Sequence, residues 1–173
     1  MVSECGTGCW ETTYKQVQLT ASKIQNGLLN VYIENNWKKI PQHQSYDILG
    51  LRWSKSSTIN SYSGTQENGS SGYVDYPMTS NNFNVDTFGI GLSQNLVDNA
   101  SRYNNSMMVT IACSNSMVIY GTYQHAQGTL TLAQSKSYSI STGGLGDVLY
   151  FSNSTIRNTY DSMQGVTLSV ICT

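Results

Sequence analysis

Short runs in which apolar and polar residues alternate make up most of the chain. They cover residues 14–20, 29–34, 46–53, 83–92, 107–113, 117–123, 128–133, 147–151 and 165–172. A period of two is typical of β-strands that bury one face, and Gly, Asn and Ser separate most of the runs. We therefore predict a single all-β domain over residues 1–173, a β-sandwich of immunoglobulin-like or jelly-roll-like type.

Two local patterns make that prediction more specific. Residues 107–113 and 117–123 flank Ser114-Asn115-Ser116, which predicts a hairpin. Helix is expected only in one or two short segments. The best candidate runs from Ser93 to about Tyr103, because Leu92, Leu96, Ala100 and Tyr103 share one helical face and Ser93 could cap it.

Residues 54–82 have no comparable pattern and are rich in Ser, Gly, Asn, Thr and Tyr. A connection of that length is uncommon in a compact domain, and it is usually either a functional loop or a mobile one. Both interpretations are open for this segment.

The composition restricts the classes of partner. Only 11% of the 173 residues are charged, the net charge is −1, and polarity comes from Ser, Asn, Thr, Gln and 12 Tyr. No basic cluster exceeds Lys38-Lys39, so we expect no nucleic acid partner and no basic patch for an anionic membrane. No apolar run approaches the roughly 18 residues of a membrane span.

Cys5, Cys9, Cys113 and Cys172 are the clearest indication of compartment. An even number of cysteines without paired metal-ligand spacing favours two disulfides over zinc, and hence a secreted protein. Three pairings are open, and we expect at least one bridge to join the two ends of the chain. Because no signal peptide precedes Cys5, Met1 is interpreted as a start added to a mature sequence.

Catalytic chemistry has little support in the sequence. His43 and His125 lack a local motif and are expected to be ordinary surface or edge-strand residues, and Gly-x-Ser-x-Gly does not occur. Asp75 and Asp86 could pair as glycosidase carboxylates, although nothing in the sequence brings them together. We predict no enzyme activity, no cofactor and no metal site.

Aromatic residues beside amides and carboxylates indicate a sugar site, since sugar CH groups stack on rings while polar side chains pair with hydroxyls. Trp37 lies among polar neighbours that predict an exposed turn. The candidate ligand-binding residues are Trp37, Tyr62, Asn68, Tyr73, Asp75 and Tyr76.

The low charge, the predicted disulfides, the short strands and the closing segment Gly165-Val-Thr-Leu-Ser-Val-Ile-Cys172 resemble one family. The chain is similar to the receptor-binding (lectin) domain of a bacterial chaperone–usher fimbrial tip adhesin. That resemblance implies a secreted virulence factor on the fimbrium that mediates cell adhesion by binding a host glycan or glycoprotein receptor. It also implies a missing C-terminal pilin domain that would contact a fimbrial subunit, and it assigns no binding residue.

Two other classes remain open. A structural pilin-type subunit would assemble by strand exchange and polymerise. A secreted toxin binding subunit or pore-former would form oligomers on liposomes.

Overall fold

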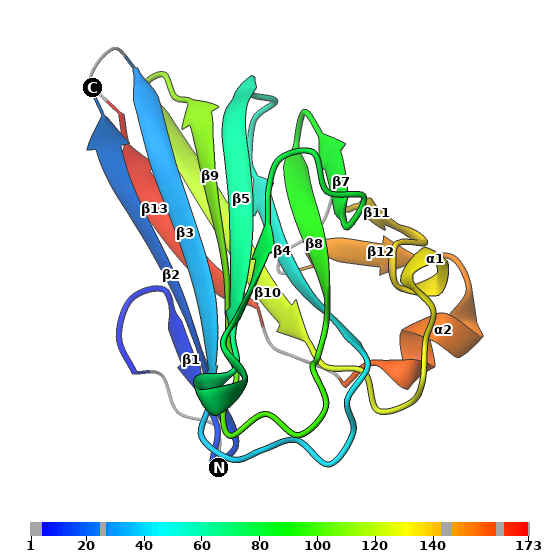
Figure 1. Cartoon of the computed structure of the whole chain (residues 1–173). Coiled ribbons are helices and arrows are strands. Elements are labelled where there is room, and N and C mark those ends of the chain that lie inside the picture. The colour runs from blue at the N-terminus through cyan, green and yellow to red at the C-terminus, as the bar shows by residue number, and fades with distance from the viewer. Residues whose placement is uncertain (1–4, 25–26, 143–146, 162–164, 173) are drawn as a thin grey trace.

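The computed structural model describes residues 5–24, 27–142, 147–161 and 165–172, and the interpretation of Met1 lies outside them. Two antiparallel sheets pack face to face, which confirms the predicted all-β sandwich (Figure 1). The first sheet has the order β1 (Cys9–Glu11), β2 (Lys15–Ile24), β3 (Leu28–Trp37), β9 (Asn104–Ala112), β5 (Ile59–Glu67) and β6 (Tyr73–Tyr76). The second has the order β13 (Val166–Ile171), β10 (Ser116–Gln124), β4 (Tyr46–Trp53), β8 (Gly89–Asn95) and β7 (Phe83–Asp86).

The main core lies between the sheets and follows from the alternation along each strand. Val31, Ile33 and Val109 from the first sheet meet Leu51 and Ile119 from the second, and all five are fully buried. Burial of such side chains stabilises the fold by about 1.5–3 kcal/mol each.

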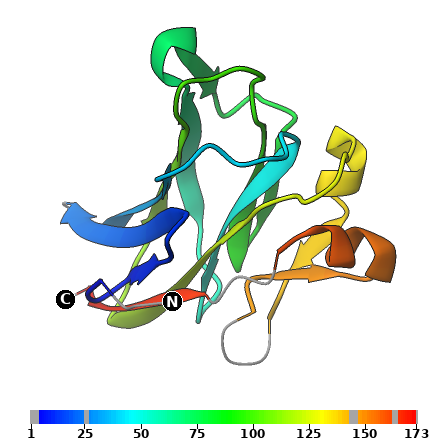
Figure 2. The ribbon, with the colours of Figure 1, turned by 90° about the horizontal axis from the view of Figure 1, so that it is seen from below.

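A smaller structure covers the other face of β4. It consists of β11 (Tyr138–Ile140) paired with β12 (Leu149–Phe151), and the short helices α1 (Leu132–Ser135) and α2 (Ser154–Thr159) (Figure 2). Leu130, Phe151 and Tyr160 form a second apolar cluster with Ile48 of β4. Strand β4 is consequently buried on both faces, which explains the apolar residues 48–51 at its centre.

The predicted helix at 93–103 is wrong. Ser93 and Gln94 continue β8 and pair with Ile48 and Asp47 of β4, and the chain after Asn95 is irregular. The apolar residues of the predicted helical face are nevertheless buried: Leu92, Leu96, Ala100 and Tyr103. The sequence pattern therefore predicted that these four residues are buried. It did not predict the backbone conformation, because pairing with β4 makes Ser93 and Gln94 part of a strand.

The predicted hairpin around Ser114–Ser116 is also wrong. Strand β9 pairs with β3 and β5, whereas β10 pairs with β4 and β13, so the turn carries the chain from one sheet to the other. Alternation gives the face that each strand buries, but it does not select the strand's neighbours.

Two further segments differ from the predictions. Residues 54–82 contain β5, β6 and the one-turn 3-10 helix η1 (Gly69–Ser71), and β5 was missed because its inward positions include Gly64 and Gln66 instead of large apolar residues. Residues 128–133 do not form a strand: Thr131 and Gln134 make a reciprocal capping box that starts α1.

Both disulfides are present, but the expected bridge between the chain ends is wrong. Cys5 pairs with Cys9, and Cys113 pairs with Cys172, with Cα–Cα distances of 5.2 Å and 5.8 Å. Gly6 and Gly8, at φ of 126° and 71°, turn the chain between the first pair. Such bonds persist in oxidising compartments and are consistent with an extracellular protein. Among the described residues, no helix is long and apolar enough to cross a membrane.

Buried tyrosines make the fold sensitive to alkali. Burial raises the pKa of Tyr76 to about 12, and it also raises the pKa of Tyr123, Tyr138 and Tyr160. A folded-state pKa above the unfolded value of about 10 gives stability that is present below pH 10 and lost as the pH rises towards the folded value.

We therefore expect cooperative unfolding between about pH 10 and 12, with Tyr76 alone accounting for about 2 kcal/mol by pH 12. Tyrosinate absorbance and circular dichroism followed together would check this. The two signals should change together; tyrosine ionisation that is complete while the circular dichroism stays native would contradict it.

Candidate functional site

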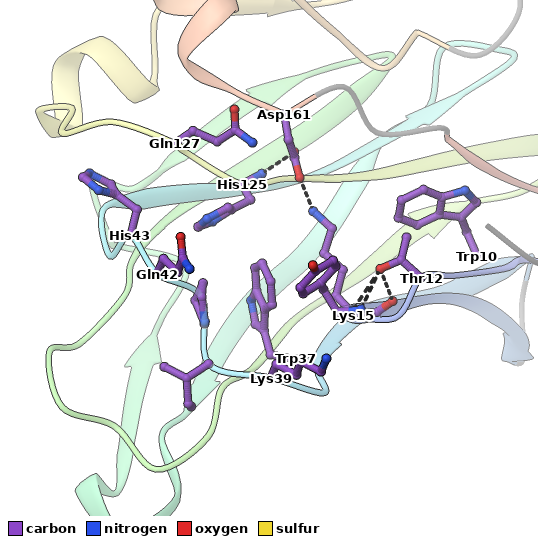
Figure 3. A pocket seen from close by; sticks show the side chains of 13 residues that line it. Trp10, Thr12, Lys15, Trp37, Lys39, Gln42, His43, His125, Gln127 and Asp161 are labelled. Atoms are coloured by element: carbon purple, nitrogen blue, oxygen red, sulfur yellow. Dashed lines mark hydrogen bonds and ion pairs between the residues drawn. The ribbon is translucent and has the colours of Figure 1, made fainter. Parts of the chain in front are cut away.

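A cleft of about 910 Å³ opens at the end of the sandwich where β1, β2, β3 and β10 meet (Figure 3). We call it the Trp37 cleft. Its lining comprises the rings of Trp10, Tyr14 and Trp37, the amides of Gln42 and Gln127, His43 and His125, Lys15 and Lys39, Asp161, Thr12, Ile40 and Pro41.

The cleft forms where the inward side of the strands changes from aliphatic to aromatic and polar. Lys15 begins β2 and Trp37 ends β3, and the two face each other in the register of that strand pair. Both continue the inward alternation of Val17 and Asn35, so the periodicity that builds the core also aims these side chains at the cleft.

Asp47 and His125 form a buried pair behind the cleft. Nδ1 of His125 lies 3.0 Å from both carboxylate oxygens of Asp47, and the Ala126 N–H donates to Asp47 Oδ1 at 2.9 Å. The Tyr123 hydroxyl donates to Asp47 Oδ2. Burial raises the pKa of Asp47, although each of these hydrogen bonds favours the ionised form.

Trp37 joins this network from the cleft side. Its Nε1 donates to the Tyr123 hydroxyl at 3.0 Å, and its ring meets the His125 ring edge-on at a centroid distance of 4.9 Å. With only 9% of its surface exposed, Trp37 is held in a single orientation. A fixed ring can present its face to a ligand without an entropic cost of ordering.

Lys15 and Asp161 make a second, partly buried pair. Lys15 Nζ lies 2.5 Å from Asp161 Oδ2 and 5.2 Å from the centroid of the Trp37 ring. Asp161 Oδ1 accepts the His125 N–H at 2.9 Å, and the His125 carbonyl accepts the Asp161 N–H at 2.9 Å. Asp161 therefore holds the backbone of His125 in place and neutralises the charge of Lys15.

Amides extend the polar network into the sandwich. The Tyr123 hydroxyl lies 3.2 Å from Asn105 Oδ1, Asn105 Nδ2 donates to Gln94 Oε1 at 2.7 Å, and Gln66 Nε2 donates to the Asn95 carbonyl at 2.9 Å. These amides are fully or almost fully buried. The cleft therefore rests on a hydrogen-bonded layer that can hold its geometry.

Of the six candidate ligand-binding residues, only Trp37 lines this cleft. The exposed turn predicted for Trp37 is wrong, because Glu34–Trp37 completes β3. The other five lie on or next to β5 and β6, and the structure does not bring them to Trp37.

Those five residues also differ in accessibility. Asn68 and Tyr76 are buried, and Tyr62 packs edge-on against Phe83 at 4.8 Å between ring centroids. Tyr73 is 69% exposed and Asp75 is exposed, with Asp75 Oδ1 accepting from Thr65. Asp75 lies on β6 and Asp86 on β7, which are edge strands of different sheets.

The Asp47–His125 pair was not expected from the sequence. His125 is buried and paired, so its interpretation as an ordinary surface or edge-strand residue is wrong. A signal was present in Asp47, a charged residue directly before the apolar residues 48–51 of the same strand. A fully buried carboxylate requires partners, and this one has three.

The hydroxyl, ring and amide groups of the cleft wall differ in role. Among the described residues that form the cleft wall, none is a serine or a cysteine. The Thr12 hydroxyl accepts the Tyr14 and Lys15 N–H groups at 3.1 Å, which gives it a structural role in the turn. The wall instead combines ring faces with amides, which is an arrangement suited to recognition.

The sequence matches no protein-family model and no curated protein. One solved structure, described as the complete structure of manganese lipoxygenase of Gaeumannomyces graminis and partial structure of zonadhesin of Komagataella pastoris, is similar with a TM-score of 0.51 and 8% identity. The similarity covers 89% of this chain and 46% of that one, so this chain spans less than half of its length. A structure of the N-terminal domain of PorA gives a TM-score of 0.26 and 8% identity over 61% of this chain and 69% of that chain. The first similarity shows a shared fold alone, and the second carries no argument.

Proposed function

We propose that this domain binds a glycan in the Trp37 cleft. The observation that carries the proposal is the convergence of three aromatic residues, Trp10, Tyr14 and Trp37, with the amides of Gln42 and Gln127 in one cleft. Sugar rings stack their CH faces on aromatic side chains, and amides donate to and accept from hydroxyls. A cleft of about 910 Å³ has room for one to a few sugar rings.

The rigidity of the site supports the same proposal. Trp37 is fixed by Tyr123 and His125, whereas Tyr14 is 58% exposed at the mouth. A buried ring as floor and an exposed ring at the rim allow one sugar to be held while a longer chain extends outward. In keeping with the resemblance to fimbrial tip adhesins, the domain would attach a cell to a host glycan.

Three exposed tyrosines allow the location of the site to be tested. Tyr14→Ala is expected to weaken glycan binding about tenfold or more, since ring stacking is lost while the fold is unaffected. Tyr73→Ala reports on the β5–β6 region, where the sequence analysis placed the site. Tyr150→Ala, at a residue 59% exposed on β12, is the control matched in exposure to Tyr14.

The measurement is a glycan array on the purified monomer, followed by calorimetric titration of the best ligand into each variant. Loss of affinity in Tyr73→Ala with none in Tyr14→Ala would move the site to β6. Absence of binding to every glycan, together with self-assembly of the protein, would overturn the proposal in favour of a pilin-type subunit.

A further inference from the structure

The wall of the Trp37 cleft contains more lysine than acidic side chains among its described residues. The whole chain has 9 Lys and Arg residues, 2 His residues and a net charge of −1. Two of these Lys and Arg residues, Lys15 and Lys39, line the cleft, and Asp161 is the acidic residue of its described wall. In a protein with so few charges, that excess gives the site a positive character.

The carboxylate of Asp161 is already engaged. Its Oδ2 accepts from Lys15 Nζ at 2.5 Å and its Oδ1 accepts from the His125 N–H at 2.9 Å. Its charge is matched by Lys15, whose side chain is 5% exposed. Asp161 therefore presents no unmatched negative charge to a ligand.

Lys39 has no comparable partner. Within the described residues no carboxylate lies within ion-pair distance of its ammonium group, which instead sits 5.4 Å from the centroid of the Tyr14 ring at the mouth of the cleft. The preceding residue, Lys38, is paired with Glu11. Lys38 is therefore neutralised outside the cleft, whereas Lys39 lies in the cleft wall.

We infer that the ligand of the Trp37 cleft is an acidic sugar whose anionic substituent pairs with Lys39 while its ring stacks on the neighbouring aromatic side chains. The inference rests on the proposed glycan-binding function and specifies the substrate class of that site. The cleft offers an unmatched cation beside an exposed ring and lacks a free carboxylate in its described wall. An ammonium–carboxylate or ammonium–sulfate contact is a charge-assisted hydrogen bond, stronger than the neutral equivalent.

Pairs of glycans that differ only in charge provide the test. Titration would compare a uronic acid oligosaccharide with its methyl ester, and a sulfated oligosaccharide with its unsulfated parent, at low and at high salt. We expect the acidic member of at least one pair to bind about tenfold or more tightly, with the advantage reduced at high salt. Which pair shows the effect distinguishes a carboxylate from a sulfate.

Lys39→Met and Lys38→Met form a matched pair of variants. Lys39→Met is expected to abolish the preference for the acidic member while binding of the neutral member continues, and Lys38→Met is expected to keep the preference. Equal binding of acidic and neutral glycans, or a preference that survives in Lys39→Met, would overturn the inference and leave the glycan-binding proposal standing. Failure of every glycan to bind would overturn both.

Discussion

Replacing Asp47 with alanine is expected to lower the free energy of unfolding by about 3–5 kcal/mol. The carboxylate is fully buried and accepts hydrogen bonds from His125, from the Ala126 N–H and from the Tyr123 hydroxyl. The substitution leaves a cavity and removes the acceptor of a buried backbone N–H, which has no access to water. Urea unfolding monitored by tryptophan fluorescence would measure the loss.

Two other variants make the test specific. Asp47→Asn keeps the size of the side chain and one carbonyl acceptor, so we expect a smaller loss than for Asp47→Ala. Asp75→Ala, at an exposed carboxylate, is expected to change stability by less than about 0.5 kcal/mol. An Asp47→Ala variant as stable as Asp75→Ala would show that the Asp47–His125 network contributes nothing to the fold.

The same substitution should weaken ligand binding. Asp47 holds His125 and Tyr123, and Tyr123 in turn accepts from Trp37 Nε1 at 3.0 Å. Loss of the carboxylate frees the rings that form the inner wall of the cleft. Asp47 is accordingly a positioning residue, and binding should fall in Asp47→Ala even under conditions in which the variant remains folded.

Removal of the Cys113–Cys172 disulfide is expected to have the second largest effect, about 4 kcal/mol. That bond joins residues separated by 59 positions, whereas Cys5 and Cys9 are separated by 4. In the chain-entropy description, the stabilisation grows with the logarithm of the loop length, because a longer loop restricts the unfolded chain more. The Cys5–Cys9 bond should therefore contribute only about 2 kcal/mol.

The Cys113–Cys172 bond also connects the two sheets. Cys113 follows β9 of the first sheet, and Cys172 follows β13 at the edge of the second. Comparing the double variants Cys113→Ala/Cys172→Ala and Cys5→Ala/Cys9→Ala by thermal and urea unfolding would measure both contributions. A larger loss from the short bridge would contradict the loop-length argument, and four reactive thiols in the native protein would exclude both bonds.

Burial follows the sequence pattern most closely. In the alternating runs that became β3 and β9, the apolar residues Val31, Ile33, Val109 and Ile111 are buried. Even in the wrongly predicted helix, Leu96, Ala100 and Tyr103 are buried as expected. Hydrophobic side chains leave water whatever the backbone geometry, so this part of the prediction does not depend on knowing the fold.

Pairing was the least predictable feature. Nothing in the turn Ser114–Ser116 indicates that it crosses between sheets, and nothing in the spacing of Cys5, Cys9, Cys113 and Cys172 selects the two observed bonds. Both depend on which strands become neighbours, and that is settled by packing of the whole core and not by local preference.

The amino-acid sequence was enough to predict a disulfide-bonded β-sandwich with few charges, because composition, cysteine number and period-two alternation can be read without knowing which strands pair. The residues that meet in the Trp37 cleft emerged from the fold alone. Lys15, Trp37, Asp47, His125 and Asp161 are scattered along the chain. They meet because β2 and β4 begin, and β3 and β10 end, near the segment after α2. Contacts between residues so far apart in the sequence depend on the whole fold. The aromatic residues of β5 and β6 are close together in the sequence and were therefore easier to propose as a site. Trp37 is the candidate that lines the cleft.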